Sequence, residues 1–405
     1  MPKERKVGIF IDSKKKSGGA YQEFLYTLKN IHKYNNGVKF VVISASKELN
    51  INLNDESLEV KYFSLNAFER YVSYLRNFSP LIRKIKRYIF FKNKFENFLL
   101  NNNIDLVYFV GPSQYSLYLE DTNFFMNIPD ISHRENFEFP EIVDSSEFRR
   151  KHDIFEKSLP RALSIITNCE IIKKRISFFY RILEEKIFII NHQPSNSITE
   201  FKKVDNTKQI EIRTKYNLPK NYIFYPAMYL PHKNHRTLLD SFKILKDKNL
   251  ANLKMVFCGN DIGYLKNLKD YAKNLNILSD ISFLNFVEDE HLPYLYYDCS
   301  VLLMPSLIGP TNIPPWEAFK MQKPVIYSSL PGIKDVLKDS VLYVDPMSKT
   351  NIADAIEKIL NDESLKKTLI DRGEKLLQES DSEKSFLKFF KIIENFRKYQ
   401  STWKF

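Results

Sequence analysis

Residues 302–326, LLMPSLIGPTNIPPWEAFKMQKPVI, predict a strand, a polar loop, a short helix and a second strand. The loop follows an apolar run, and Gly309 lies among its helix-breaking residues. Pro314 and Pro315 suit the first turn of a helix, where backbone donors are not needed, so we expect a helix over 314–322. Strand, loop, helix and strand in this order are typical of a parallel α/β sheet.

The first turn of this predicted helix carries an acid, Glu317, and a candidate cap, Asn312, precedes it. A helix N-terminus attracts anions because unpaired N–H groups and the macrodipole converge there. A carboxylate at that end does not favour the phosphate itself, but it can accept hydrogen bonds from the hydroxyls of an adjacent ribose. The pattern therefore predicts a nucleotide-sugar site. The alternative is that Glu317 only stabilises its own helix, which contributes ~0.3–1 kcal/mol.

The same segment resembles the signature of the family-4 (group 1) glycosyltransferases, in which two glutamates separated by seven residues flank a Gly/Pro-rich loop. Glu317 matches the second glutamate, whereas Gly309 stands where the first is expected. The variant GPTNIPPWEA resembles a branch found among enzymes of bacterial surface-polysaccharide assembly. The resemblance implies that Glu317 binds the donor ribose, and that Gly309, Thr311, Asn312 and loop amides face the diphosphate or the sugar. Asn312 is the candidate catalytic substitute for the missing glutamate.

A second segment, YPAMYLPHKNH (225–235), follows a predicted strand and precedes a predicted helix. It resembles the diphosphate loop of the same family, and Lys233 matches the family's lysine, whose ammonium neutralises the leaving diphosphate during catalysis. The arginine expected five residues earlier is replaced by Met228, so one cation is missing. His232 and His235 flank Lys233 and are expected to supply part of the lost hydrogen bonding. The alternative for Lys233 is a solvated loop lysine.

The chain opens with a buried-type strand, VGIFID (7–12), which is followed by Gly18, Gly19 and an amphipathic helix. Strand, glycine loop and helix begin many nucleotide-binding α/β domains, but the G-x-G-x-x-G spacing of a dinucleotide site is absent. The family resemblance implies that Gly18 and Gly19 lie near the donor phosphate, at a cleft between two domains. A plain turn into the first helix is the alternative.

The segment DISHRENFEFPE (130–141) crowds a histidine and an arginine among acids and aromatic residues. It resembles the family's histidine segment in the N-terminal domain, where the acceptor hydroxyl and the transferred sugar meet. The resemblance implies that His133 is a catalytic residue that hydrogen-bonds the sugar or orients the acceptor. It also implies that Arg134 binds the acceptor or a phosphate. A structural loop histidine is the alternative for His133.

The length of 405 residues suits two domains of about 200 residues each. The resemblance implies an α/β protein of GT-B fold, in which two Rossmann-like, doubly wound parallel-sheet domains face a cleft. We expect an acceptor-binding domain over 1–200, a nucleotide-sugar-binding domain over 201–382, and a helix over 383–405 that crosses back to the first domain. The predicted strands are 7–12, 39–44, 60–63, 105–110, 163–167, 187–190, 221–227, 253–259, 281–284, 300–304, 324–327 and 341–345.

Composition excludes several classes of protein. Hydrophobic residues make up 43% of the chain and charged residues 27%, and no apolar run approaches the ~20 residues of a membrane-spanning helix. Three distant cysteines and a charged N-terminus without a signal region predict a cytoplasmic protein. The chain has no Asp-x-Asp pair of the kind that holds a divalent ion in metal-dependent glycosyltransferases. We therefore expect no metal and no other cofactor, with protein charges neutralising the leaving group.

The net charge of +12, from 61 basic and 49 acidic residues, predicts an anionic partner. Residues 80–99 interleave basic and aromatic side chains, a pattern typical of binding to an anionic membrane surface. This pattern predicts peripheral association at the inner face of the plasma membrane, and a pair of ordinary solvated helices is the alternative. No recognised nucleic-acid module accompanies the charge, so nucleic acid is not expected as a partner.

The function implied by the resemblance is glycosyl transfer with retention of configuration. A hexose or deoxyhexose, of mannose or rhamnose type, would pass from a nucleoside-diphosphate sugar to a glycan or lipid-linked glycan acceptor. Two alternatives stay open. A nucleotide-sugar 2-epimerase of the same fold would need no acceptor. A catalytically degenerate binding subunit would be consistent with the replacements at Met228 and Gly309.

Overall fold

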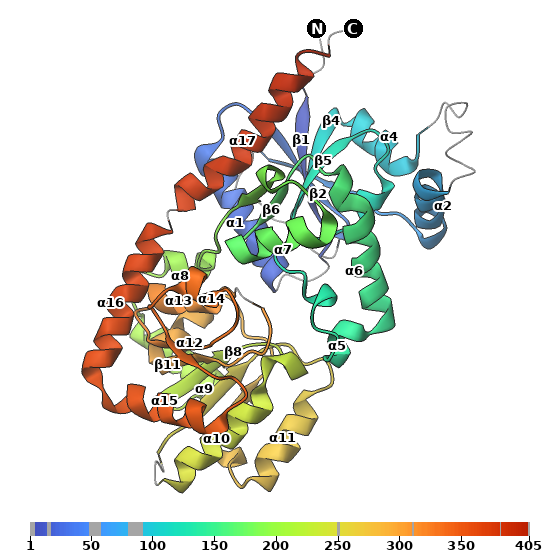
Figure 1. Ribbon diagram of the computed structural model, residues 1–405. Coiled ribbons are helices and arrows are strands. Elements are labelled where there is room, and N and C mark those ends of the chain that lie inside the picture. Colours follow the sequence, from blue (N-terminus) through green and yellow to red (C-terminus); the bar gives the residue numbers. More distant parts are fainter. Residues whose placement is uncertain are drawn as a thin grey trace. The chain divides into compact units, whose positions relative to one another are not determined.

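The computed structural model describes residues 5–13, 18–47, 58–79, 92–248, 252–309, 312–380 and 382–403. The chain divides into two compact units, each built on a parallel sheet (Figure 1). Unit 1 comprises Met1–His133, Asp144–Asn191 and Ser382–Phe405, and unit 2 comprises Arg134–Val143 and His192–Asp381. Residues 134–143, which the sequence places in the N-terminal domain, therefore group with the second unit.

Unit 1 contains a seven-stranded parallel sheet in the order β3-β2-β1-β4-β5-β6-β7. Strands β2 and β3 lie in chain order on one side of β1. Strands β4 to β7 lie in chain order on its other side. The strand order therefore reverses between β1 and β4, which are hydrogen-bonded neighbours. The strands are β1 (Lys6–Ile11), β2 (Lys39–Ser44), β3 (Glu59–Tyr62), β4 (Ile104–Phe109), β5 (Asn123–Asn127), β6 (Ile165–Thr167) and β7 (Ile187–Ile189).

The last helix, α17 (Ser382–Gln400), packs in the core of unit 1 although it ends the chain. Its Phe389 ring lies 5.0 Å from the ring of Tyr108 and 5.2 Å from that of Phe125, measured between centroids. Figure 1 shows this red helix beside β1 and α1. The sheet and α17 thus share one hydrophobic core. The other α-helices of unit 1 are α1 (Gly19–Tyr34), α2 (Ala67–Phe78), α4 (Lys94–Asn101), α6 (Ser145–Ser158) and α7 (Glu170–Tyr180).

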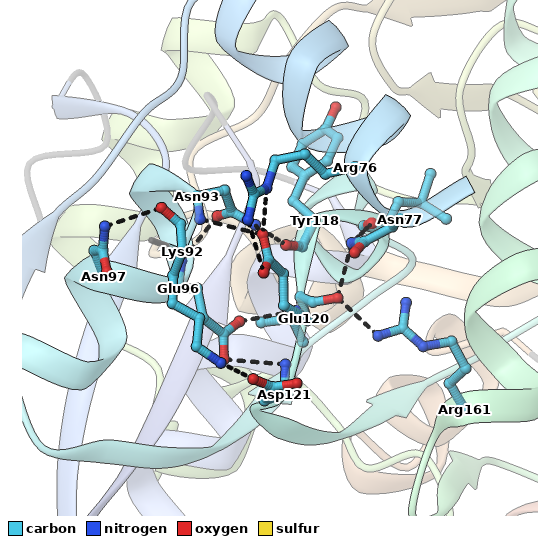
Figure 2. Close-up of polar contacts among 12 residues, drawn as sticks. Arg76, Asn77, Lys92, Asn93, Glu96, Asn97, Tyr118, Glu120, Asp121 and Arg161 are labelled. Carbon is cyan, nitrogen blue, oxygen red and sulfur yellow. Dashed lines mark hydrogen bonds and ion pairs between the residues drawn. The ribbon is translucent and has the colours of Figure 1, made fainter. Parts of the chain in front are cut away.

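A buried polar network joins α2 and α4 to the turn before β5 (Figure 2). Glu96, only 1% exposed, accepts hydrogen bonds from the backbone N–H groups of Glu120 at 2.9 Å and Thr122 at 2.7 Å. Glu120 in turn receives two hydrogen bonds from the Arg76 guanidinium, at 2.8 and 3.3 Å, and one from the Asn93 side chain at 2.8 Å. Because these charges are paired and hydrogen-bonded, the network offsets the cost of burying them and anchors both helices.

Residues 80–91 of the basic segment 80–99 lie outside the described residues. The remainder belongs mainly to α4, whose Phe95 and Leu99 are fully buried. One face of α4 thus packs inside unit 1, while Lys94 and Asn97 are exposed, and association of the segment with a lipid surface stays a prediction. Among the helices that the structure describes, none is both long and apolar enough to cross a bilayer.

Unit 2 contains a six-stranded parallel sheet in the order β10-β9-β8-β11-β12-β13, and this order reverses between β8 and β11. The strands are β8 (Tyr222–Pro226), β9 (Met255–Cys258), β10 (Ile281–Leu284), β11 (Cys299–Met304), β12 (Val325–Ser328) and β13 (Leu342–Val344). The α-helices are α5 (Pro140–Val143), α8 (Asn196–Glu200), α9 (Asn206–Tyr216), α10 (His235–Asp247), α11 (Leu265–Asn274), α12 (Leu292–Asp298), α13 (Pro314–Lys320), α14 (Ile333–Leu337), α15 (Lys349–Asn361) and α16 (Glu363–Glu379).

Candidate functional site

The carboxyl ends of β8 and β11 are neighbours in unit 2, at the point where its strand order reverses. In open α/β sheets ligands bind beyond the carboxyl ends of the strands at such a point. Two loops follow these strands: residues 227–234, which we call the lysine loop, lead to α10, and residues 305–313, the signature loop, lead to α13. The sheet therefore brings together the two segments that the sequence singles out.

Hydrogen bonds fix the two loops against each other. The N–H of Leu307 in the signature loop donates to the carbonyl of His232 in the lysine loop at 2.8 Å. The buried Tyr225 hydroxyl donates to the Lys233 carbonyl at 2.8 Å and lies 3.0 Å from Ser306 Oγ. The backbone that carries Lys233 is thus held from two sides, while the residue itself stays partly exposed.

Asn234 ends the lysine loop in a left-handed conformation, with φ at 62°, which asparagine tolerates better than most residues. Its side-chain amide donates to the carbonyls of Pro305 at 2.9 Å and Pro346 at 2.7 Å. It therefore does not cap α10, and no side-chain cap is present at that helix end. This 13-residue helix begins at His235, two residues after Lys233, and its first-turn N–H groups are candidate donors for an anion.

The first turn of α13 offers few N–H groups of its own to an anion. The helix spans seven residues, Pro314–Lys320, and its two leading prolines have no N–H. The N–H groups of Trp316 and Glu317 both donate to the carbonyl of Ile313, at 3.0 and 3.2 Å. Asn312 is not the cap, because Ile313 occupies that position. An anion site at the start of α13 stays a prediction, and the start of α10 is a second candidate.

Gly309 has φ at +94°, a conformation that other residues seldom adopt, so the path of the signature loop requires a glycine at this position. Asn312 Nδ2 donates to the Tyr327 hydroxyl and lies 3.4 Å from the Gly309 carbonyl. The side chain of Asn312 thus links the backbone at Gly309 to Tyr327 on β12. Its contact with a donor sugar stays a prediction, and Thr311 lies outside the described residues.

Glu317 is 4% exposed, and its carboxylate is bonded to other parts of unit 2. Its Oε2 accepts a hydrogen bond from the Tyr296 hydroxyl at 2.8 Å. Burial raises the pKa of Glu317, and this hydrogen bond opposes that rise. A ribose hydroxyl would reach this carboxylate beside or in place of the Tyr296 hydroxyl.

His235 lies in the core of unit 2 and not at the lysine loop. It is 1% exposed, and its ring centroid lies 4.9 Å from that of Tyr225, 5.2 Å from that of Tyr229 and 5.2 Å from that of Phe257. Neither ring nitrogen has a hydrogen-bond partner among the described residues. Burial and nearby positive charges lower the pKa of His235 to about 3. The expectation that His235 replaces hydrogen bonds lost with the arginine is therefore wrong.

Replacing His235 by phenylalanine should reduce the acid sensitivity of folding. The folded-state pKa is about 3 and the ordinary value is 6.5, so between these values the unfolded chain binds a proton that the folded chain does not. The stability that depends on the neutral ring is thus complete above pH 6.5 and is lost as the pH falls toward 3. Urea unfolding at pH 7.5 and 4.5 should show a loss about 3 kcal/mol smaller in His235→Phe. Equal losses in both proteins would contradict a buried neutral ring.

His133 lies in the interior of unit 1, in the 3-10 turn η4 (Ser132–Arg134). It is 1% exposed, its Nε2 lies 3.1 Å from the Tyr180 hydroxyl, and its ring centroid lies 4.6 Å from that of Phe155. This environment fits the alternative of a structural loop histidine, and the catalytic contact of His133 stays a prediction. Arg134 is partly exposed, and its contact with an acceptor stays a prediction.

Gly18 and Gly19 lie at the start of α1 in unit 1. Gly18 has φ at +87°, whereas a Cβ added at either glycine would meet no atom of the described residues within 4 Å. Gly18 is thus required by the backbone conformation and not by a lack of space. Their contact with the donor phosphate stays a prediction.

Unit 1 has a pocket of about 340 Å³ at its own strand-order reversal, formed by residues that follow β1, β4 and β5 and by residues of α6. This volume is near the lower end of the roughly 300–1,000 Å³ found for small-molecule sites. Two carboxylates, Asp12 and Asp130, and two cations, Arg150 and Lys151, line it. The carboxylates can accept hydrogen bonds from sugar hydroxyls, and the cations can bind an anionic group.

Asp130 is a candidate residue that the sequence analysis misses. Ser132 donates to its Oδ1 through its N–H at 3.0 Å and its hydroxyl at 2.6 Å. Burial alone would raise the pKa of Asp130, but Lys151 and the Ser132 hydrogen bonds hold it below the ordinary value. Asp130 is therefore an ionised acceptor inside the pocket. The available signal is an acid shortly after a strand end, but it depends on β5, which the sequence analysis does not predict.

The part of the chain that the structure describes contains neither an assembled metal site nor a cysteine with a lowered thiol pKa. No group of three or more His, Cys, Asp or Glu side chains there is placed to hold a metal ion. Burial raises the pKa of Cys169 to about 11 and the pKa values of Cys258 and Cys299 to about 12, so these thiols stay protonated at neutral pH.

Comparison with known proteins gives a family match within unit 2. Residues 207–376 match the family described as "Glycosyl transferases group 1". The O-antigen chain mannosyltransferase RfbU of Salmonella typhimurium is 27% identical over 206 residues, which are 51% of this chain and 53% of the relative. The capsular polysaccharide biosynthesis glycosyltransferase CapM of Staphylococcus aureus is 30% identical over 234 residues, 54% of this chain and 57% of the relative. The chain thus matches about half the length of these relatives.

A solved structure extends the likeness to nearly the whole chain. HepE of Anabaena, in complex with UDP and glucose, has a TM-score of 0.70 at 16% identity, covering 96% of this chain and 100% of the other. At this level of identity the likeness shows the fold. The predicted α/β class, with two Rossmann-like parallel sheets of GT-B type, is confirmed.

Proposed function

Residues 207–376 belong to the group 1 glycosyltransferases, and on that premise we propose that the chain is a retaining, metal-independent glycosyltransferase. It transfers a mannosyl, or a related hexosyl or deoxyhexosyl, unit from a nucleoside-diphosphate sugar. The acceptor is a glycan or a lipid-linked glycan of a bacterial surface polysaccharide. The names of RfbU and CapM support this pathway, and that of RfbU supports the mannosyl unit. The observation that carries the proposal is the hydrogen-bonded pair of loops at the ends of β8 and β11.

On the donor side, Lys233 and the first-turn N–H groups of α10 bind the diphosphate. Both lie beyond the end of β8, and the Lys233 backbone is fixed by Tyr225. Fixed positive groups stabilise the charge that develops on the leaving phosphate, because they need no reorganisation as the bond breaks. Glu317 accepts hydrogen bonds from the ribose hydroxyls, beside or in place of the one that the Tyr296 hydroxyl donates in the structure.

The transfer proceeds on one face of the sugar. The bond between the anomeric carbon and the diphosphate oxygen breaks, and the acceptor oxygen forms the new bond from the same side. The leaving phosphate oxygen takes the proton of the acceptor hydroxyl. Gly309 has no side chain that could act as a nucleophile, so the protein contributes orientation and charge stabilisation rather than a covalent intermediate. Asn312 is our candidate for holding the hydroxyls of the donor sugar.

The protein works in the cytoplasm, where nucleotide sugars are available, and reaches a lipid-linked acceptor at the inner face of the plasma membrane. The sequence of residues 80–91, which is basic and aromatic, supports association with anionic lipid. Binding of the full chain to vesicles with and without phosphatidylglycerol tests this association.

The pocket of unit 1 is our candidate for the acceptor, and Asp130→Asn tests it. Loss of the carboxylate charge should raise KM for an acceptor at least tenfold, because charge-assisted hydrogen bonds to its hydroxyls weaken. Transfer from GDP-mannose to p-nitrophenyl mannoside measures this KM, and KM for the donor should stay unchanged. Asp153→Asn is the control, since Asp153 lies on the same helix as Lys151 and pairs with Lys157 outside the pocket. An unchanged acceptor KM in Asp130→Asn would place the acceptor elsewhere.

A nucleotide-sugar panel tests the proposed function as a whole. Thermal unfolding of the full chain should shift upward with one of GDP-mannose, UDP-glucose or dTDP-rhamnose, because a ligand that binds only the folded state stabilises it. The shifted donor is then incubated with and without an acceptor, and the anomeric configuration of the product is read by NMR. Release of an epimer from the donor alone would favour an epimerase. Binding without transfer or hydrolysis would favour a degenerate binding subunit.

A further inference from the structure

Glu141 of α5 contacts the lysine loop, although 91 residues separate it from His232 in the chain. Both residues belong to unit 2. The Oε1 atom of Glu141 accepts a hydrogen bond from the backbone N–H of His232 at 3.0 Å and lies 2.5 Å from Nδ1 of the same residue. An ionised carboxylate only accepts, so Nδ1 carries the proton in this contact. One carboxylate oxygen therefore holds both the main chain and the ring of His232.

This contact is largely removed from water. The side chains of His232 and Glu141 are 13% and 12% exposed, and the Phe139 ring meets the His232 ring edge-on at 6.1 Å between centroids. The second oxygen of Glu141, Oε2, is buried without a hydrogen-bond partner among the described residues. Leaving a carboxylate oxygen unsatisfied costs stability, so packing alone gives no reason for an acid at this position. A role in positioning the residues of the lysine loop gives such a reason.

His232 is fixed at three points. Glu141 holds its N–H and its ring, and its carbonyl accepts the hydrogen bond from Leu307 of the signature loop at 2.8 Å. His232 directly precedes Lys233, so fixing the backbone of His232 also fixes the backbone nitrogen of Lys233, the residue that bears the ammonium. Met228, in the same loop, stands where the family resemblance expects a second cation and carries no charge. The lysine loop therefore has one cation fewer than its family resemblance implies, and a histidine held by an acid.

We propose that Glu141 is a positioning residue for the leaving diphosphate. It acts through His232, which it holds so that Lys233 is directed to the diphosphate. Because the Nδ1–H of His232 is engaged by Glu141, the ring serves as the second donor as an imidazolium, through Nε2–H, in place of the arginine missing at Met228. This inference rests on the proposed function, since it assigns a further residue to the same donor site. Glu141 itself does not touch the substrate.

Two substitutions in the full chain test this role, Glu141→Ala and Glu141→Gln. Titration calorimetry with UDP, GDP and dTDP should show at least tenfold weaker binding of the preferred diphosphate in Glu141→Ala, which is ~1.4 kcal/mol. Glu141→Gln keeps an accepting oxygen and should recover part of this loss. Affinity for the corresponding nucleoside should not change, because the nucleoside lacks the diphosphate that the lysine loop binds. A merely structural role would weaken nucleoside and diphosphate alike.

A matched control and a double substitution complete the test. Glu138→Ala removes an exposed acid three residues away and should bind the diphosphate like the original chain. If Glu141 acts through His232, the double variant Glu141→Ala/His232→Ala should lose clearly less affinity than the sum of the two single losses, since alanine at position 232 keeps only the backbone N–H contact with Glu141. Additive losses would overturn the inference. Should Glu141→Ala fail to fold by circular dichroism, Glu141→Gln decides, and a diphosphate affinity equal to that of the original chain would then overturn it.

The two proposals fail in distinguishable ways. If the original chain binds none of the three diphosphates and none of the nucleotide sugars, the proposed function is wrong and this inference falls with it. If the original chain binds a diphosphate and Glu141→Ala binds it equally well, only the positioning role of Glu141 is wrong.

Discussion

Lys233→Ala should lower kcat by roughly 10²–10³-fold, the loss seen when one fixed group that stabilises transition-state charge is removed. Lys233 follows β8 at the strand-order reversal of unit 2, and its backbone is held by the Tyr225 hydroxyl. Without the ammonium, only the first-turn N–H groups of α10 and the His232 ring would remain as donors to the leaving diphosphate. Initial rates with the preferred nucleotide sugar, at saturating donor and acceptor, measure the change in kcat.

Lys220→Ala is the control for this prediction, because Lys220 is an exposed lysine of the same unit, just before β8. It should leave kcat and the affinity for nucleoside diphosphates unchanged. If Lys233→Ala turned over at the original rate and bound the diphosphate with the original affinity, Lys233 would be the solvated loop lysine of the alternative interpretation.

Glu317→Ala should weaken both donor binding and folding. Loss of the hydrogen bonds to a ribose would cost ~1–3 kcal/mol of binding free energy, about ten- to a hundredfold in Kd. The substitution also leaves the buried Tyr296 hydroxyl without its acceptor, which costs ~1–3 kcal/mol of unfolding free energy. Calorimetric titration with the preferred nucleoside diphosphate and urea unfolding separate the two losses.

Two comparison variants sharpen this result. Glu317→Gln keeps an accepting oxygen and should fold nearly as well as the original chain while binding the diphosphate more weakly. Glu363→Ala removes a first-turn glutamate from another helix, α16, and should cost at most ~1 kcal/mol of stability without affecting the donor. If Glu317→Ala behaved like Glu363→Ala, with unchanged donor affinity, Glu317 would serve its own helix and unit 2 only.

Much of the fold can be predicted because strands buried on both faces form continuous apolar runs. KFVVIS (39–44) and ISFL (281–284) coincide with β2 and β10 residue for residue. Strand β5, NFFMN, escapes prediction because it is short, begins and ends with asparagine, and lies between loops. Its absence from the prediction also hides Asp130, whose place in the pocket depends on the end of that strand.

The candidate site is predictable only in part. The meeting of the lysine loop and the signature loop follows from the strand order, because both loops leave neighbouring strands. Burial is not visible in the motif, so the sequence does not show that the rings of His133 and His235 are both buried. Nor does it show that the start of α10 has no side-chain cap and is a second candidate for the anion site. The Glu141–His232 contact spans 91 residues, and no local pattern indicates it.

Hydrogen–deuterium exchange of the full chain, with and without its preferred nucleoside diphosphate, tests most directly whether the donor binds at the ends of β8 and β11. We expect slower exchange in peptides that cover residues 231–239 and 305–321, since the diphosphate would engage α10 and the lysine loop while the ribose engages Glu317. Exchange in peptides of α15 and α16 should not change. Protection confined to unit 1, or none in these two stretches despite measured binding, would contradict the assignment of the donor site to unit 2.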